Sequence, residues 1–205
     1  ARGLATIGDV RALGALLQLS RETDPLLRRA AAAALQKLHD PRARRRLLWM
    51  LDDRDAGVRG AALDAYAQLA AEGAGEGDAS LGGAEAALRS AFEDIRVRGL
   101  EQLVKVSGPA RAQAESLLSE AVEDEAPKVR AEALRTLWAW HEREPQPVLD
   151  RAREARFSDI RLRAVQELAT HAANQKDGAW ARERLLGLIG DRDAGVAQAA
   201  FDEGV

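Results

Sequence analysis

Apolar residues recur along this chain with the spacing of one helical face. In two segments the same pattern of five positions repeats: Val58, Ala62, Leu63, Tyr66 and Leu69, and then Val129, Ala133, Leu134, Leu137 and Trp140. No stretch alternates apolar and polar residues as a half-buried strand would. The pattern therefore predicts an all-α protein.

A second set of apolar stripes predicts a helix in front of each of these helices. The predicted first helices span residues 9–19, 42–51, 84–92, 111–122, 147–155 and 179–189. A single pair cannot bury the apolar faces of both helices, so its stability must come from stacking on neighbouring pairs. We therefore expect about six stacked helix pairs.

The second helices begin with a recurring motif, in which an acidic residue is followed by an aliphatic residue and then an arginine. Its copies start at Asp24, Asp55, Asp94, Glu125, Asp159 and Asp193. The aliphatic positions are 31 to 39 residues apart, the length of one helix hairpin. The longest step contains the glycine-rich segment 72–83, which we predict to be a flexible loop insertion.

The pattern Asp-x-x-Val-Arg-x-x-Ala-x-x-Ala-Leu resembles the HEAT family, especially the HEAT-like repeats of phycobilin lyases. Residues 55–66 and 128–137 match it best. The resemblance implies a right-handed α-solenoid of about six HEAT-like hairpins, in which the second helices line the concave side. It covers nearly all of residues 1–205, which we expect to form a single repeat array from a longer protein. The resemblance identifies an architecture and leaves the activity open.

The motif also predicts a structural Asp–Arg ladder. Each motif Asp is placed to cap a helix, and the Arg four residues later faces the same side, within reach of that carboxylate or of the next one. The predicted ladder comprises Asp24, Arg28, Asp55, Arg59, Asp94, Arg98, Arg130, Asp159 and Arg163. The alternative is a row of cations for an anionic ligand.

Composition and charge narrow the class of function. The formal net charge of −3 lacks the basic excess of a dedicated duplex-binding protein. The chain has no cysteine, which excludes disulfides and thiolate metal sites. No apolar run approaches the length of a membrane span, and nothing indicates secretion, so we expect a cytoplasmic protein with no membrane partner.

We find no catalytic constellation in the sequence. The three histidines, His39, His141 and His171, each lie near the end of a second helix, where they suit the helix dipole. HEAT-like di-iron hydroxylases use repeated His-Glu pairs, whereas this chain has one, His141-Glu142. We therefore expect no catalytic site, no metal site, no cofactor and no enzyme activity.

Two features are candidates for binding a partner. The first is the basic run Arg42, Arg44, Arg45 and Arg46, which could instead be a solvated helix face. The second is Trp138, which lies about 180° from the packed face of its helix. An exposed tryptophan would be a good anchor for a partner, and packing on the next hairpin is the alternative.

These observations favour a protein–protein interaction or scaffolding module, with another protein as its partner. A nucleic-acid-binding module, as in the HEAT-like DNA glycosylases, is the second hypothesis. A chromophore-lyase-like enzyme, suggested by the repeat resemblance alone, is the third. The identity of the partner and the oligomeric state stay open.

Overall fold

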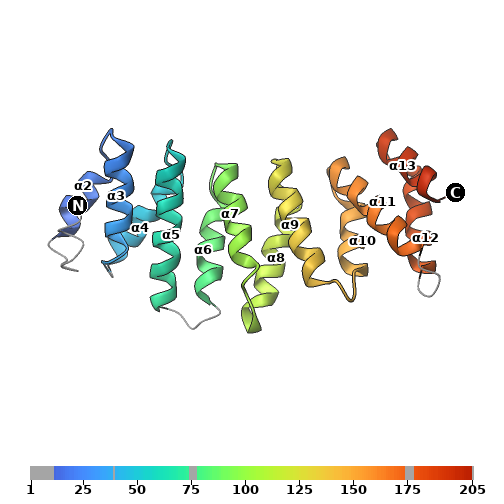
Figure 1. The fold of residues 1–205 in the computed structure, drawn as a ribbon, viewed down its shortest axis with the longest axis horizontal. Coiled ribbons are helices and arrows are strands. Elements are labelled where there is room, and N and C mark those ends of the chain that lie inside the picture. Colours follow the sequence, from blue (N-terminus) through green and yellow to red (C-terminus); the bar gives the residue numbers. More distant parts are fainter. Residues whose placement is uncertain (1–11, 39, 74–77, 174–177, 205) are drawn as a thin grey trace. The chain divides into compact units, whose positions relative to one another are not determined.

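A computed structural model describes residues 12–38, 40–73, 78–173 and 178–204, and the helices in these ranges form six consecutive pairs (Figure 1). The first helices of the pairs are α2 (Leu13–Leu19), α4 (Pro41–Met50), α6 (Asp78–Leu88), α8 (Arg111–Ala121), α10 (Gln146–Glu154) and α12 (Ala179–Gly187). The second helices are α3 (Pro25–Leu35), α5 (Ala56–Gly73), α7 (Glu93–Leu103), α9 (Pro127–Trp140), α11 (Ser158–Ala172) and α13 (Ala194–Gly204). Two short 3-10 helices, η2 (Gly108–Ala110) and η3 (Leu188–Gly190), complete the described elements.

The predicted fold class is confirmed. The described residues are helical and contain no strand, and their paired helices have the architecture of an α-solenoid repeat protein. The chain divides into two compact units, residues 1–114 and 115–205. The single array over residues 1–205 stays a prediction.

In the first unit the second helices α3, α5 and α7 lie side by side, and each packs on the first helix of its own pair (Figure 1). Their core is built from Leu and Ala side chains, which let helices approach closely. Leu35, Leu63 and Leu100 are fully buried at its centre. Because each second helix contacts both its own partner and the next second helix, the hairpins stabilise one another.

The second unit repeats this packing. Helix α11 contacts α9, α10, α12 and α13. Its buried residues Val165 and Leu168 share one core cluster with Leu185 and Val196 of the last hairpin.

Helix boundaries follow the capping residues at three of the motif positions. Asp24 is the N-cap of α3 and accepts a hydrogen bond from the N–H of Leu26, at 2.8 Å. Asp55 accepts one from the N–H of Val58, at 3.0 Å, at the start of α5. At the last of them, Asp193 accepts hydrogen bonds from the N–H groups of Gly195 and Val196 at the start of α13. By contrast, Asp94 and Asp159 lie inside the first turns of α7 and α11, where Phe92 and Phe157 are the N-cap residues. At these two positions the aspartate is not the cap that the motif predicts.

The glycine-rich insertion is shorter than predicted. Helix α5 continues to Gly73 and α6 begins at Asp78, so part of segment 72–83 is helical. Residues 74–77 lie outside the described residues. The difference arises because Leu81 in this segment is buried and extends the packed face of α6, and glycine reduces helix propensity without forbidding a packed helix.

Within the described ranges, no helix combines the length and the apolar character that a membrane span requires.

Candidate functional site

Four arginines of the second helices are buried at equivalent places, and we call them joint arginines: Arg28, Arg59, Arg130 and Arg161. Each donates from Nη1 to main-chain carbonyl oxygens five and six residues earlier. The guanidinium thereby closes the turn that precedes its own helix. Its other nitrogens are left for the next hairpin.

Each joint arginine also binds an aspartate of the following hairpin, in one of two geometries. Arg28 and Arg161 make bidentate contacts with Asp53 and Asp191, with nitrogen–oxygen distances of 2.7 to 2.9 Å. A bidentate guanidinium–carboxylate pair is the strongest and most directional of such contacts. Both aspartates also accept a hydrogen bond from the backbone N–H two residues later.

The second geometry adds an aromatic ring. Arg59 and Arg130 donate to one oxygen of Asp94 and Asp159, respectively. Their guanidinium carbons lie 3.9 and 3.8 Å from the ring centres of Phe92 and Phe157. A cation over the face of an aromatic ring is stabilised electrostatically. This stabilisation takes the place of the contact with the second carboxylate oxygen.

The positions of Arg98 and Arg163 differ from the predicted ladder. Arg98 pairs with Asp64 at 2.8 Å in an exposed contact. Arg163 is exposed, and the buried arginine of α11 is Arg161, two residues earlier. The reason is the core position: Ile95 and Ile160 are fully buried, whereas Val97 and Leu162 are half-buried. The residue after the core aliphatic is therefore Arg96 or Arg161.

Electrostatics at these pairs favour the charged forms. The pKa of Asp191 lies below its ordinary value of 3.8, chiefly because Arg161 donates hydrogen bonds to it. The pKa of Arg28 is raised, first by its hydrogen bonds to Asp53. The joint arginines are thus held by groups of the protein itself.

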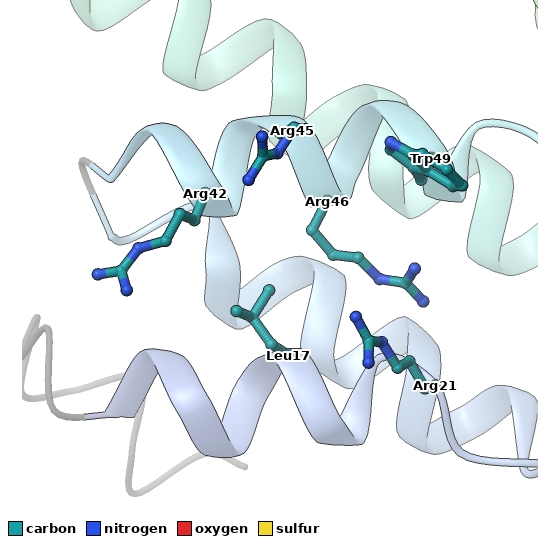
Figure 2. A pocket seen from close by; sticks show the side chains of 6 residues that line it. All are labelled: Leu17, Arg21, Arg42, Arg45, Arg46 and Trp49. Carbon is teal, nitrogen blue, oxygen red and sulfur yellow. The ribbon is translucent and has the colours of Figure 1, made fainter.

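A different set of arginines surrounds an open pocket of about 570 Å³ between α2 and α4. Figure 2 shows the six residues that line this arginine pocket: Leu17, Arg21, Arg42, Arg45, Arg46 and Trp49. On α4 the buried residues Ala43, Leu47 and Met50 fix the helix to the core. The opposite face therefore presents its arginines and its tryptophan to the pocket.

Two of the four pocket arginines have partners in the protein. Arg42 forms a bidentate contact with Asp40, the N-cap residue of α4, and this contact lowers the pKa of that carboxyl. Arg46 donates from Nε to the hydroxyl of Ser20 and from Nη2 to its carbonyl oxygen, each at 2.7 Å. Arg46 is therefore fixed in place by neutral acceptors.

The other two, Arg21 and Arg45, are exposed and have no ion pair with a described residue. Figure 2 shows the guanidinium groups of Arg21 and Arg46 facing one another across the gap between the helices. Burial lowers the pKa of Arg46, and the charge of Arg21 lowers it further; the charge of Asp53 opposes the effect. Positive charge is thus concentrated here without a carboxylate among the lining residues.

The two tryptophans of interest have opposite environments. Trp49, which the sequence reasoning did not single out, is 73% exposed at the edge of the arginine pocket. Trp138 is half-buried and packs against the core of the second unit. Its indole N–H is buried with no hydrogen-bond partner among the described residues. Of the two alternatives for Trp138, the geometry favours packing.

The four arginines of the basic run lie in two different places. Arg42, Arg45 and Arg46 line the arginine pocket, whereas Arg44 points elsewhere and lies over the ring of Tyr66, 5.3 Å from its centre. The helical spacing of positions 42, 45, 46 and 49 is the signal that could have separated Arg44 from the rest and added Trp49. Leu17 and Arg21 come from another helix, and no local pattern marks them.

The histidines form no cluster of metal ligands. His141 contacts Glu115 through Nε2 at 2.9 Å, and the ring of His171 lies 5.5 Å from that of Trp180 between centres, tilted by 44°. His39 lies outside the described residues. Among the residues that the structure describes, no three His, Cys, Asp or Glu side chains converge as a metal site would require.

Comparisons with known proteins give the same class as the fold, a helical-repeat protein. Residues 1–67 match the family model for HEAT repeats, which confirms the predicted resemblance for that part of the chain. Among curated proteins no significant match exists. The fold, with its paired and stacked helices, is a repeat scaffold of a kind usable for binding other proteins.

Solved structures similar to this chain share no more than its fold. An archaeal HEAT-like repeats protein from Thermococcus onnurineus NA1 is 17% identical over 98% of this chain and 90% of its own, with a TM-score of 0.44. Human deoxyhypusine hydroxylase is 20% identical over 98% of this chain and 76% of its own, with a TM-score of 0.40. A designed armadillo repeat protein in complex with the peptide (KR)4 is 19% identical over 93% of this chain and 98% of its own, with a TM-score of 0.37.

Proposed function

We propose that this chain is a protein-binding scaffold module, with no catalysis of its own, and that the arginine pocket is its binding site. The observation that carries the proposal is Trp49, a large aromatic side chain left 73% exposed beside a pocket of about 570 Å³. Tryptophan and arginine are the residues most enriched among those that dominate binding energy at protein interfaces. Both types meet in this pocket.

The packing around the pocket supports the same function. Leu47 and Met50 are fully buried, so the backbone of α4 is fixed while its outer face stays free. A rigid helix face binds with a smaller loss of conformational entropy than a mobile loop does. The backbone of Trp49 is therefore fixed at the edge of the pocket, where a partner can pack on its side chain.

The test is affinity capture of proteins from a cell lysate with the tagged chain. It compares Trp49→Ala with the unsubstituted protein. Leu186→Ala is the matched control, because Leu186 is also a large exposed apolar residue but belongs to α12 and does not line the pocket. We expect specific proteins that are captured by the unsubstituted chain and by the control, and are lost with Trp49→Ala. Capture of the same proteins by all three would contradict the assignment of this site.

A further inference from the structure

We propose that the arginine pocket binds an acidic peptide segment of the partner, with carboxylates at Arg21 and Arg45 and an apolar side chain on Trp49 and Leu17. This inference rests on the proposed function and names the chemistry of the ligand. Among the described residues, the side chains that line the pocket provide four guanidinium groups, one indole and one leucine, and none of them is acidic. A concentration of one sign of charge attracts the opposite sign.

The four arginines of the pocket have two different roles. Arg42 is bound by Asp40 and Arg46 by Ser20, so these two fix the charge and shape of the pocket. Arg21 and Arg45 have no ion pair with a described residue, and their guanidinium groups are exposed. A ligand carboxylate therefore meets its open hydrogen-bond donors at Arg21 and Arg45.

Crowding of like charge around the pocket favours an anionic ligand. Arg46 is half-buried and faces Arg21, and its pKa is lowered chiefly by burial and in smaller part by the charge of Arg21. A carboxylate between the two helices replaces repulsion by attraction. Bidentate guanidinium–carboxylate contacts also set the orientation of the bound segment.

The apolar residues distinguish a peptide from a nucleic-acid backbone. Leu17 packs on the core and Trp49 lies beside the guanidinium groups, so the pocket offers an apolar surface directly next to its charge. Acidic peptides commonly carry an apolar side chain next to a carboxylate. A phosphate backbone needs a continuous basic track, whereas the chain carries a net charge of −3 and these arginines are confined to one pocket.

The test is fluorescence anisotropy with the full chain and a labelled short peptide in which Asp and Glu alternate with Leu. The same peptide with Asn and Gln in place of the acids, and a labelled single-stranded oligonucleotide, are the comparison probes. We expect saturable binding of the acidic peptide alone. Arg21→Glu and Arg45→Glu should each weaken it by about tenfold or more, because each removes a charge-assisted contact and adds repulsion.

Arg163→Glu is the matched control, because Arg163 is an exposed arginine of α11 and the change in charge is identical. It should leave the affinity nearly unchanged, and circular dichroism should show equal helicity in all variants. Equal binding of the amide peptide, or undiminished binding by Arg21→Glu and Arg45→Glu, overturns the inference. If the oligonucleotide binds best and its binding is lost in the same two variants, the inference is also overturned and the pocket is assigned to nucleic acid.

The affinity capture and the peptide-binding assay test different claims, so one can fail while the other succeeds. If the acidic peptide does not bind but protein capture still depends on Trp49, the ligand chemistry is wrong and the proposed function stands. If the peptide binds and capture is independent of Trp49, the pocket recognises acidic segments but does not carry the scaffold function.

Discussion

At the scale of single residues, Arg161 and Arg163 stand two positions apart on α11 and have opposite environments. The side chains of Arg161 and Asp191 are only 4% and 7% exposed, and they form a bidentate contact. Arg161→Ala would leave the Asp191 carboxylate buried without its cation. We expect the free energy of unfolding to fall by about 3 kcal/mol, measured by urea unfolding followed by circular dichroism.

Arg163→Ala provides the control in the same helix. Because Arg163 is exposed, its loss should change the free energy of unfolding by less than about 0.5 kcal/mol. Equal destabilisation by the two substitutions would mean that the buried pair contributes no more than an exposed arginine does.

The same pair of residues shows how far the sequence could predict the fold. The repeating Asp, aliphatic and Arg pattern was enough to predict helix hairpins and their number. It misaligned two repeats, because Asp94-Ile-Arg-Val-Arg98 offers two aliphatic–arginine steps and the short motif alone does not say which is buried. The small residue and aliphatic that follow four and five positions later, Gly99 and Leu100, select Ile95.

The candidate site was less predictable than the fold. Arg42, Arg45 and Arg46 could be named from the sequence because they lie on one helix. Arg21 reaches the pocket only because α2 packs beside α4, and that contact is a tertiary one. Trp138 is a similar case: its angle on α9 left exposure and packing on the next hairpin both open, and the tertiary structure packs it against the core of the second unit.

At the scale of helices, the close approach of α6 and α7 depends on Gly99. A Cβ at this position would lie 2.7 Å from the Cβ of Ala87 and 3.2 Å from the carbonyl oxygen of Ala84. Neither atom belongs to the end of a flexible side chain, so the helices would have to separate. We expect Gly99→Ala to lower the free energy of unfolding by about 1–3 kcal/mol, despite the better helix propensity of alanine.

Gly14→Ala on α2 tests a position where the gain in helix propensity has no packing cost against it. Among the described residues, no atom apart from the backbone of its own helix and its chain neighbours lies within 4 Å of a Cβ added there, so only the propensity gain remains. The substitution should raise the free energy of unfolding by about 0.5–1 kcal/mol in the same urea experiment. If Gly99→Ala were also stabilising, the contact between α6 and α7 would be looser than its geometry indicates.

At the scale of the whole molecule, acid should weaken both units through their bidentate joint pairs. The pKa values of Asp53 and Asp191 are lowered in the folded state from 3.8. Burial alone would raise the pKa of Asp53, but its hydrogen bonds with Arg28 and with the N–H of Asp55 outweigh that effect. For Asp191 the hydrogen bonds from Arg161 are the largest cause.

The sign of the effect follows from proton uptake. An aspartate whose pKa is lower in the folded state binds protons more readily in the unfolded state as the pH falls. Its stabilisation is therefore complete above the unfolded value near pH 4 and is lost as the pH falls through the folded value. We expect the free energy of unfolding to be level from neutral pH to about pH 5 and to decrease below about pH 4.

Asp191→Asn should separate this contribution from general acid effects. The variant should be less stable at neutral pH, because Arg161 loses its charged partner, and its stability should fall less steeply in acid. Asp64→Asn removes the exposed pair with Arg98, whose side chains are 60% and 40% exposed, and should leave the steepness unchanged. If the free energy of unfolding of Asp191→Asn fell equally steeply in acid, other carboxylates would cause the acid sensitivity. The Arg161–Asp191 pair would then only position the two hairpins.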